Sequence, residues 1–214
     1  MLKTKQGLEI PCVCVTNRKL CREDFLERLR QIADSGQADA IVLREKDLSE
    51  KEYYRLAEQV MRLCDTYSVP CVLHSFYRVA VGLGCRRIHL PYAVLEQLKS
   101  QPDKDSKVKW GDMQKDSFDT IGTSVHSVEQ AEQAIRFGAG YVIAGHIFDT
   151  DCKKGLPGRG LPFVQDVSHA VPAGIPVFGI GGINAQNAPA VVEAGASGVC
   201  IMSGFMVESK LGLC

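Results

Sequence analysis

The sequence predicts one α/β domain over residues 1–214, folded as a single (β/α)8 TIM barrel. Short apolar runs alternate along the chain with segments of helical period, and this alternation is typical of a parallel sheet covered by helices. About eight such runs are present, and eight βα units are what a closed barrel requires. Barrels of this kind usually take ~250 residues. A chain of 214 residues therefore predicts a closely trimmed barrel.

The predicted strands are the short apolar runs themselves. They are Ile10–Val15, Ala40–Leu43, Pro70–Leu73, Arg87–Leu90, Thr120–Thr123, Tyr141–Ala144, Pro176–Ile180 and Gly198–Met202. In a barrel of this type the active site lies at the carboxyl ends of the strands. The residues that follow each run are therefore the candidates for chemistry.

Four segments between the strands carry apolar residues on one face and are predicted to be helices. They are Arg22–Ser35, Ser49–Tyr67, Val128–Phe137 and Asn184–Ala194. Ser49 with Glu52 three residues later has the pattern of a capping box, and Asn184 is expected to cap the last of the four. Gly36, Gly138 and Gly195 follow three of these helices, where a left-handed residue is favoured.

Two segments depart from the repeat. The polar segment Ser100–Ser117 is predicted to be a surface loop. About a dozen residues follow Met202, too few for a full final helix, so we expect this helix to be short or missing. Apolar surface would then remain near Phe205 and Met206, and a second copy of the chain would cover it in a homodimer.

The charge balance argues for a small ligand. Lys and Arg total 25, as do Asp and Glu, so no overall field would attract nucleic acid or a membrane. No stretch approaches the ~18 apolar residues of a membrane span, and we expect a cytoplasmic protein. The nine cysteines are odd in number and form no Cys-x-x-Cys pair. Disulfides and zinc are therefore not expected.

Glycine-rich loops follow the last two predicted strands. The first is Gly179-Ile180-Gly181-Gly182-Ile183, and the second is Met202-Ser203-Gly204. Glycines allow the backbone to approach an anion closely, and the amides of the helix from Asn184 onward would face it. We expect Gly181, Gly182, Ser203 and Gly204 to bind a phosphate group. The alternative is that the glycines only form tight turns.

Two histidines follow neighbouring strands. His126 comes after strand five and His146 after strand six, so both would point into the same mouth. Histidine is the natural proton carrier near neutral pH, and the pair predicts acid/base catalysis. The alternative for each is a hydrogen-bonded core or rim residue. His74 and His89 are weaker candidates, and His169 is expected on a helix surface.

Charged residues follow strand two. Arg44, Glu45 and Lys46 come directly after an apolar run, and charges there need a partner or a ligand because unpaired burial is unfavourable. Arg44 could instead pair with an internal acid. Glu45 could share proton transfer with a histidine or orient it.

The loop from Phe148 to Gly160 is rich in glycine and cations. It predicts a mobile lid that brings Lys153 or Arg159 towards an anionic ligand, the alternative being a solvated loop. Cys152 lies in the same loop, but nothing else in the sequence favours it as a nucleophile.

Together these motifs resemble the thiamin phosphate synthase superfamily from Val15-Thr16 through Ser203. The motifs that carry the resemblance are Leu43-Arg44-Glu45-Lys46, Gly122-Thr123-Ser124-Val125-His126-Ser127, Gly145-His146-Ile147-Phe148, Thr150-Asp151-Cys152-Lys153-Lys154-Gly155, Gly179-Ile180-Gly181-Gly182-Ile183 and Met202-Ser203-Gly204. The resemblance implies one of two activities. A synthase joins a pyrimidine pyrophosphate to a thiazole phosphate with Mg²⁺, and a TenI-type thiazole tautomerase aromatises a thiazole carboxylate phosphate by moving a proton.

Departures from the synthase pattern favour the tautomerase. Where synthases carry an Asn-Asp pair after strand three, this chain has His74-Ser75, and the segment Leu90–Val94 after strand four has no carboxylate. Mg²⁺ requires oxygen ligands, usually carboxylates. The synthase Gln before Arg44 is Val42 here, whereas Arg44, Lys46 and Lys153 are retained and favour the synthase. Gly145-His146 resembles the tautomerase.

The expected function is therefore a thiazole tautomerase acting on a small phosphorylated thiazole without a cofactor. His146 would be the main acid/base, and Glu45 and His126 would position or relay the proton. The runner-up is a thiamin phosphate synthase, the only reading that requires Mg²⁺. A third alternative is a barrel that binds a phosphorylated ligand without catalysis.

Overall fold

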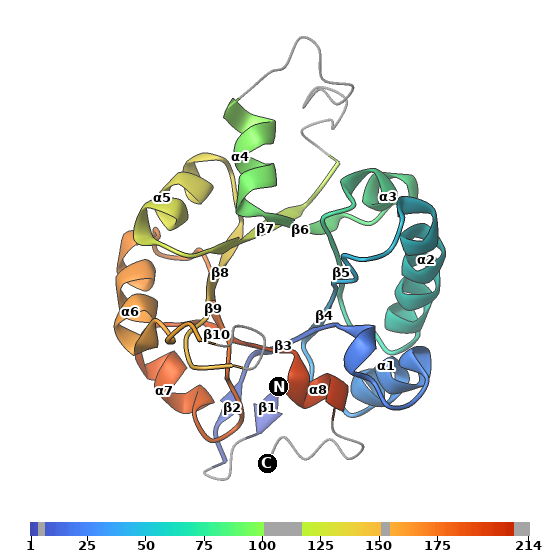
Figure 1. The fold of residues 1–214 in the computed structure, drawn as a ribbon, viewed down its shortest axis with the longest axis horizontal. Coiled ribbons are helices and arrows are strands. Elements are labelled where there is room, and N and C mark those ends of the chain that lie inside the picture. Colours follow the sequence, from blue (N-terminus) through green and yellow to red (C-terminus); the bar gives the residue numbers. More distant parts are fainter. Residues whose placement is uncertain (4–6, 101–116, 151–154, 208–214) are drawn as a thin grey trace.

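A computed structural model of the chain describes residues 1–3, 7–100, 117–150 and 155–207. Eight parallel strands close into a barrel in which each strand pairs with its neighbours in the order β10-β3-β4-β5-β6-β7-β8-β9 (Figure 1). The strands are β3 (Cys12–Val15), β4 (Ala40–Leu43), β5 (Cys71–His74), β6 (Arg87–Pro91), β7 (Thr120–Val125), β8 (Tyr141–Gly145), β9 (Val177–Ile180) and β10 (Gly198–Ile201). The predicted (β/α)8 barrel is confirmed.

Helices surround the barrel as an outer ring (Figure 1). They are the short 3-10 helix η1 (Arg18–Leu20), α1 (Phe25–Asp34), α2 (Glu50–Thr66), α3 (Tyr77–Gly82), α4 (Tyr92–Ser100), α5 (Val128–Arg136), α6 (Gly160–Ala170), α7 (Ala188–Glu193) and α8 (Ser203–Val207). The four predicted helices are present with shifted ends, and α3, α4 and α6 were not predicted. Among the described residues no helix combines the length and apolar character needed to cross a bilayer.

Local hydrogen bonds explain where the predicted helices begin. Ser49 caps α2 with the predicted box: its hydroxyl accepts from the Glu52 N–H, and the Glu52 carboxylate accepts from the Ser49 N–H. The helix predicted from Asn184 begins four residues later, because the Asn184 side chain accepts from the amides of Gln186 and Asn187 and so closes a turn. The glycine loop after β9 therefore leads into a turn and not directly into a helix.

The apolar residues form two layers. Alternate strand residues point into the barrel, where Val15, Val42, Val72, Ile143 and Cys200 pack as one cluster. The remaining strand residues pack against the helices in a larger outer core. The inner cluster forms the floor beneath the carboxyl ends of the strands, and this rigid floor supports the candidate site.

The chain ends differ from the sequence-based picture. A two-stranded antiparallel hairpin that was not predicted, β1 (Leu2–Lys3) with β2 (Glu9–Ile10), precedes the barrel and buries Leu2 and Ile10. The final helix α8 is short, as expected. However, it buries Phe205 and Met206, which are 0% and 2% exposed, so the apolar surface expected there is absent. The homodimer stays a prediction, but exposed apolar surface at Phe205 and Met206 no longer supports it.

The polar loop predicted over Ser100–Ser117 lies mostly outside the described residues. Helix α4 includes Ser100, and the structure describes the chain again from residue 117. Seven of the nine cysteines are described, and all seven are free thiols; Cys152 and Cys214 lie outside the described residues.

Candidate active site

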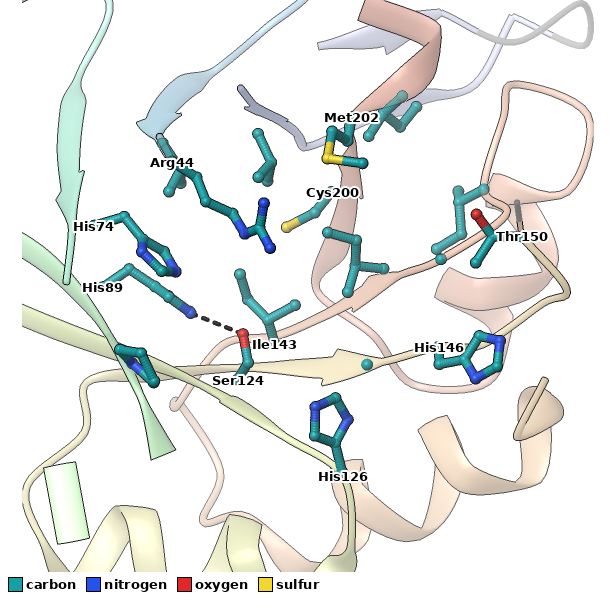
Figure 2. Close-up of a pocket in the computed structure, with 18 of the residues that line it drawn as sticks. Arg44, His74, His89, Ser124, His126, Ile143, His146, Thr150, Cys200 and Met202 are labelled. Carbon is teal, nitrogen blue, oxygen red and sulfur yellow. Dashed lines mark hydrogen bonds between the residues drawn. The ribbon is translucent and has the colours of Figure 1, made fainter. Parts of the chain in front are cut away.

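A cavity of about 520 Å³ opens at the carboxyl ends of the barrel strands. Every strand of the barrel contributes to its walls or floor, directly or through the loop that follows (Figure 2). Val15, Val42, Ile143 and Cys200 form the apolar floor, and polar side chains stand above them. The position is the one that the barrel topology predicts for an active site.

Two stacked imidazoles form one wall of the cavity. His74 ends β5 and His89 lies in β6, with ring centroids 5.4 Å apart. The His89 ring is hydrogen-bonded on both nitrogens, Nδ1 with the Tyr141 hydroxyl at 3.1 Å and Nε2 with the Ser124 hydroxyl at 2.8 Å. The hydroxyl of Ser75 lies 2.7 Å from Nδ1 of His74. The His89 ring is therefore fixed in orientation by side chains of β7 and β8, and the His74 ring by Ser75 and by stacking on His89.

A missing side chain on β7 makes room for this network. A Cβ on Gly122 would lie 1.9 Å from Cζ of Tyr141, so only glycine at position 122 accommodates the ring of Tyr141 in the barrel interior. The Tyr141 hydroxyl then reaches His89 across β7. The strand interior thus places a phenol and an imidazole together although 52 residues separate them.

The two imidazoles are neutral at physiological pH. Burial lowers the pKa of His74 to about 2, with His89, Lys46 and Arg44 contributing further. Burial, followed by Lys46 and Arg44, lowers the pKa of His89 to about 3. These rings can donate or accept hydrogen bonds, but they do not supply positive charge.

Positive charge comes from the loop after β4. Arg44 and Lys46 both line the cavity beside the imidazole wall, and Figure 2 shows the guanidinium of Arg44 projecting into the cavity. Arg44 is half-buried and Lys46 is exposed. Partial burial, and to a lesser degree Arg44, lower the pKa of Lys46 from its usual value. Both predicted cations thus reach the site.

Glu45 lies between these cations in sequence, but its side chain points away from the cavity toward Thr16 and Arg18. Its carboxylate is 2% exposed and accepts hydrogen bonds from the Thr16 hydroxyl at 2.7 Å, the Arg18 N–H at 3.0 Å and Nη1 of Arg18 at 3.1 Å. It is not among the described residues that line the cavity. The structure therefore places Glu45 in an ion pair with Arg18, away from the histidines that it was expected to assist.

His126 and His146 both line the cavity, but in different settings. His126 follows β7 and is exposed, and its ring occupies the space that a Cβ on Gly145 would fill, 2.4 Å from Cε1. His146 follows β8, is 4% exposed and has a left-handed backbone with φ of 63°. Its Nε2 atom is buried without a hydrogen-bond partner. Figure 2 shows both rings on the β7–β8 side.

The glycine loop after β9 packs tightly against the loop after β8. The amides of Ile147 and Phe148 donate to the carbonyls of Ile180 and Gly181, both at 3.0 Å. A Cβ on Gly181 would lie 2.8 Å from Cα of His146, and one on Gly182 would lie 2.5 Å from the carbonyl oxygen of Asp149. Both glycines also have positive φ. Gly181 and Gly182 therefore form the tight turn that the alternative interpretation expects.

The predicted phosphate loop reaches the cavity in three of its four residues. Gly181, Gly182 and Ser203 line the cavity, and Gly204 does not. In the lid segment, Nη1 of Arg159 donates to the Gly145 carbonyl at 3.1 Å, and its guanidinium stacks 5.5 Å from the Phe163 ring centroid. Arg159 is thus tied to the barrel and does not line the cavity. Lys153 lies outside the described residues.

Sequence reasoning missed the roles of Tyr141 and Ser124 and ranked His74 and His89 too low. One usable signal was present in β7: Ser124 lies two residues after Gly122, and residues two apart in a strand face the same side of the sheet. Gly122 within β7 was a second signal, because glycine inside a strand indicates close approach of another group.

Comparisons with known proteins give consistent matches over nearly the whole chain. It is 30% identical to a thiamine-phosphate synthase of Clostridium acetobutylicum over 197 residues, covering 92% of this chain and 87% of the relative. It is 32% identical to a thiamine-phosphate synthase of Desulfitobacterium hafniense, covering 91% and 88%. A solved structure of thiamine phosphate pyrophosphorylase from Pyrococcus furiosus matches with a TM-score of 0.75 at 26% identity, covering 94% and 90%.

These relatives correct the expected function. The tautomerase prediction rested on the missing carboxylates after β5 and β6 and on the Gly145-His146 pair, and it is wrong, because the quoted relatives are thiamine-phosphate synthases. The structure supplies a packing reason for the pair, since Gly145 makes room for the His126 ring and the backbone of His146 packs against Gly181. The family model for thiamine monophosphate synthase matches residues 12–205, and the chain belongs to the thiamine monophosphate synthase family of enzymes.

Proposed function

We propose that this protein is a transferase that couples a pyrimidine pyrophosphate to a thiazole phosphate, releasing pyrophosphate and forming thiamin phosphate. The observation that carries the proposal is a single cavity with two different sides suited to anions. Arg44 and Lys46 supply cations after β4, and Gly181, Gly182 and Ser203 line the cavity after β9 and β10. A coupling enzyme that binds two phosphorylated substrates at once needs two such sides.

The barrel order places these sides apart. In the closed ring β3 separates β4 from β10, and β3 and β10 separate β4 from β9. A phosphate on Gly181, Gly182 and Ser203 and a pyrophosphate near Arg44 and Lys46 would then be separated by the apolar floor. The two heterocycles would meet over that floor, where water is excluded and proximity favours the reaction.

The histidines have assigned positions in this proposal. His126 lines the cavity at its exposed rim, where it would contact the bound heterocycles. The buried Nε2 of His146 has no partner and is available for a hydrogen bond with a substrate. Neither histidine needs to donate a proton to the leaving group, because pyrophosphate leaves as an anion that cations stabilise.

Synthases of this family use Mg²⁺, so the donor atoms of the cavity bear on whether this chain can hold the ion. Mg²⁺ prefers oxygen ligands and usually one or two carboxylates. Among the described residues that line the cavity there is no Asp or Glu, and no cluster of three His, Cys, Asp or Glu residues forms in the described part of the chain. His74 and Ser75 stand where the resemblance expects the Asn-Asp pair. These residues do not fit a protein-held Mg²⁺.

This lack of carboxylates favours a second candidate, a barrel that binds the phosphorylated ligands without coupling them. One experiment distinguishes the two. Purified protein is incubated with both substrates, with Mg²⁺ in one series and a chelator in the other, and thiamin phosphate is followed by liquid chromatography with mass spectrometry. Product in either series supports the transferase. Saturable binding of both substrates with no product in either series supports the binding protein and overturns the transferase.

Variants test the two sides separately. Arg44→Ala is expected to raise the KM for the pyrimidine pyrophosphate, and Gly182→Ala the KM for the thiazole phosphate, each by at least ~10-fold. Lys51→Ala on the exposed face of α2 is the matched control for loss of a cation. Equal effects of Arg44→Ala on both substrates would contradict the assignment of sides.

A further inference from the structure

The wall formed by His74 and His89 presents imidazole rings and no carboxylate to the cavity. We propose that the β4–β6 side of the cavity binds a pyrophosphate group directly through Arg44 and Lys46, without a divalent cation held by protein carboxylates. The inference rests on the proposed function for the identity of the anion. It goes beyond that function because it assigns the binding of pyrophosphate to Arg44 and Lys46, beside a neutral imidazole wall, and not to a protein-held Mg²⁺.

The first support is the set of donor atoms. The residues that β5, β6 and the start of α4 present to the cavity are His74, His89, Pro91, Tyr92 and Ala93, and none of them offers a carboxylate oxygen. Both nitrogens of His89 are already engaged, one by Tyr141 and one by Ser124. A hard divalent cation would thus find imidazole nitrogen and a hydroxyl where it prefers carboxylates.

The second support is the local charge. Arg44 and Lys46 lie close enough to both imidazoles to lower the pKa of each. The field that disfavours a protonated imidazole also disfavours a divalent cation, and it favours an anion at the same place. The wall therefore stays neutral while two cations stand beside it.

The third support is that nearby carboxylates are already paired. Glu45 is bonded to Arg18 and Thr16, and Asp47 binds Arg18 at 2.6 Å and Lys19 at 3.0 Å. In the part of the chain that the structure describes, no ion pair joins Arg44 or Lys46 to an acid. Both cations line the cavity. Their charge is thus left for the ligand, and direct ion pairing with a pyrophosphate would neutralise it.

The two modes of binding predict opposite effects of Mg²⁺. In solution Mg²⁺ complexes pyrophosphate and neutralises part of its charge. If protein cations bind the free anion, added Mg²⁺ leaves the affinity unchanged or weakens it. If a carboxylate-held ion bridges protein and anion, added Mg²⁺ strengthens binding. The sign of the effect decides between the modes without any turnover.

The test is isothermal titration calorimetry of inorganic pyrophosphate into the purified full-length protein, in EDTA and in excess Mg²⁺. We expect saturable binding in EDTA and no tightening in Mg²⁺. Arg44→Ala and Lys46→Ala should each weaken binding in EDTA by ~10-fold or more, as loss of a charged contact implies. Lys51→Ala should bind as the wild type does. Tightening by ~10-fold or more in Mg²⁺, or no binding in EDTA, overturns the proposal.

An engineered carboxylate gives a second, independent measurement. His74→Asp places an acid in the wall beside the two cations, and His74→Asn is its uncharged control of nearly equal size. We expect His74→Asp, but not His74→Asn, to weaken binding in EDTA and to regain affinity when Mg²⁺ is added. Circular dichroism confirms that each variant is folded. If the two variants bind pyrophosphate equally in EDTA and respond equally to Mg²⁺, the charge of the wall does not control anion binding and the proposal is overturned.

These outcomes are distinguishable from those of the proposed function. Pyrophosphate that binds only with Mg²⁺, in a protein that forms thiamin phosphate, overturns this inference alone. Pyrophosphate that binds without metal, in a protein that forms no product, overturns the transferase and leaves this inference standing.

Discussion

The imidazole of His126 lies against the backbone of Gly145. A Cβ built on residue 145 would fall 2.4 Å from Cε1 and 2.6 Å from Nδ1 of that ring. Gly145 ends β8 and His126 follows β7, so the two belong to neighbouring strands at the cavity mouth. The present position of the ring therefore depends on the absence of a side chain at residue 145.

Gly145→Ala should displace this ring while the barrel stays folded. His126 is exposed, so its ring can rotate away, and Gly145 does not have the positive φ that disfavours alanine. Misplacement of a substrate-contacting group by about 1 Å lowers rates by up to ~10²-fold. We expect kcat/KM for coupling to fall ~10- to 100-fold, measured by steady-state kinetics, with a thermal midpoint shifted by less than about 4 °C.

Gly140→Ala is the control for this prediction. A Cβ on Gly140 would meet its nearest neighbours at 3.8 Å, an ordinary contact, so neither activity nor stability should change. If Gly145→Ala keeps the kinetics of Gly140→Ala, the position of the His126 ring is unimportant for the reaction.

The fold could be predicted because the strands are short apolar runs that alternate with helical segments. The ends were harder: β7 runs to Val125, two residues past its predicted end, because Ser124 points inward to His89 and reads as polar in a linear sequence. Helix α3 was missed because it has six residues and no side-chain cap. Helix α6 was missed because its first turn, from Gly160, contains a proline.

The sequence predicted those site residues whose position depends on a single strand, and it missed contacts that depend on two or more strands. Arg44, Lys46 and the glycine loops follow their strands directly, so the barrel topology placed them. The partner of Glu45 is Arg18, which follows a different strand, and the sequence holds several acids and cations that could have paired. The Tyr141–His89 contact depends on Gly122 in the strand between them, a three-way fit that no single segment reveals.

Glu45→Gln tests whether this carboxylate is structural. The carboxylate accepts three hydrogen bonds from Thr16 and Arg18, and loss of its charge weakens the bonds from Arg18. We expect the free energy of unfolding to fall by about 1–3 kcal/mol in urea denaturation. The shape of the pH profile of kcat/KM should not change. A displaced limb in that profile would instead indicate that Glu45 takes part in proton transfer.

Arg28→Leu tests how the short final helix is held. Arg28 in α1 is 1% exposed, and its Nε donates to the Phe205 carbonyl in α8 at 2.6 Å. Removal of a charged donor from a buried carbonyl destabilises by ~1.5–3 kcal/mol, and the lower end is expected because Nη2 of Arg28 has no partner. Thermal unfolding should show the loss. Arg30→Leu, which removes an exposed cation paired with Glu27, should leave the midpoint nearly unchanged; equal losses in both variants would refute the anchoring role.

The buried imidazole wall predicts a loss of stability in mild acid. An unfolded histidine titrates near ~6.5, whereas burial holds the pKa of His74 at about 2 and that of His89 at about 3. Below pH ~6.5 the unfolded chain therefore binds protons that the folded chain does not, and stability falls by ~1.4 kcal/mol per pH unit for each ring. Between pH 7.5 and pH 5 we expect a loss of ~4 kcal/mol from the two rings together in urea denaturation. His89→Gln should remove about half of this dependence, and His169→Gln on the surface of α6 should remove none; a wild type and His89→Gln with the same slope would show that His89 is protonated in the folded protein.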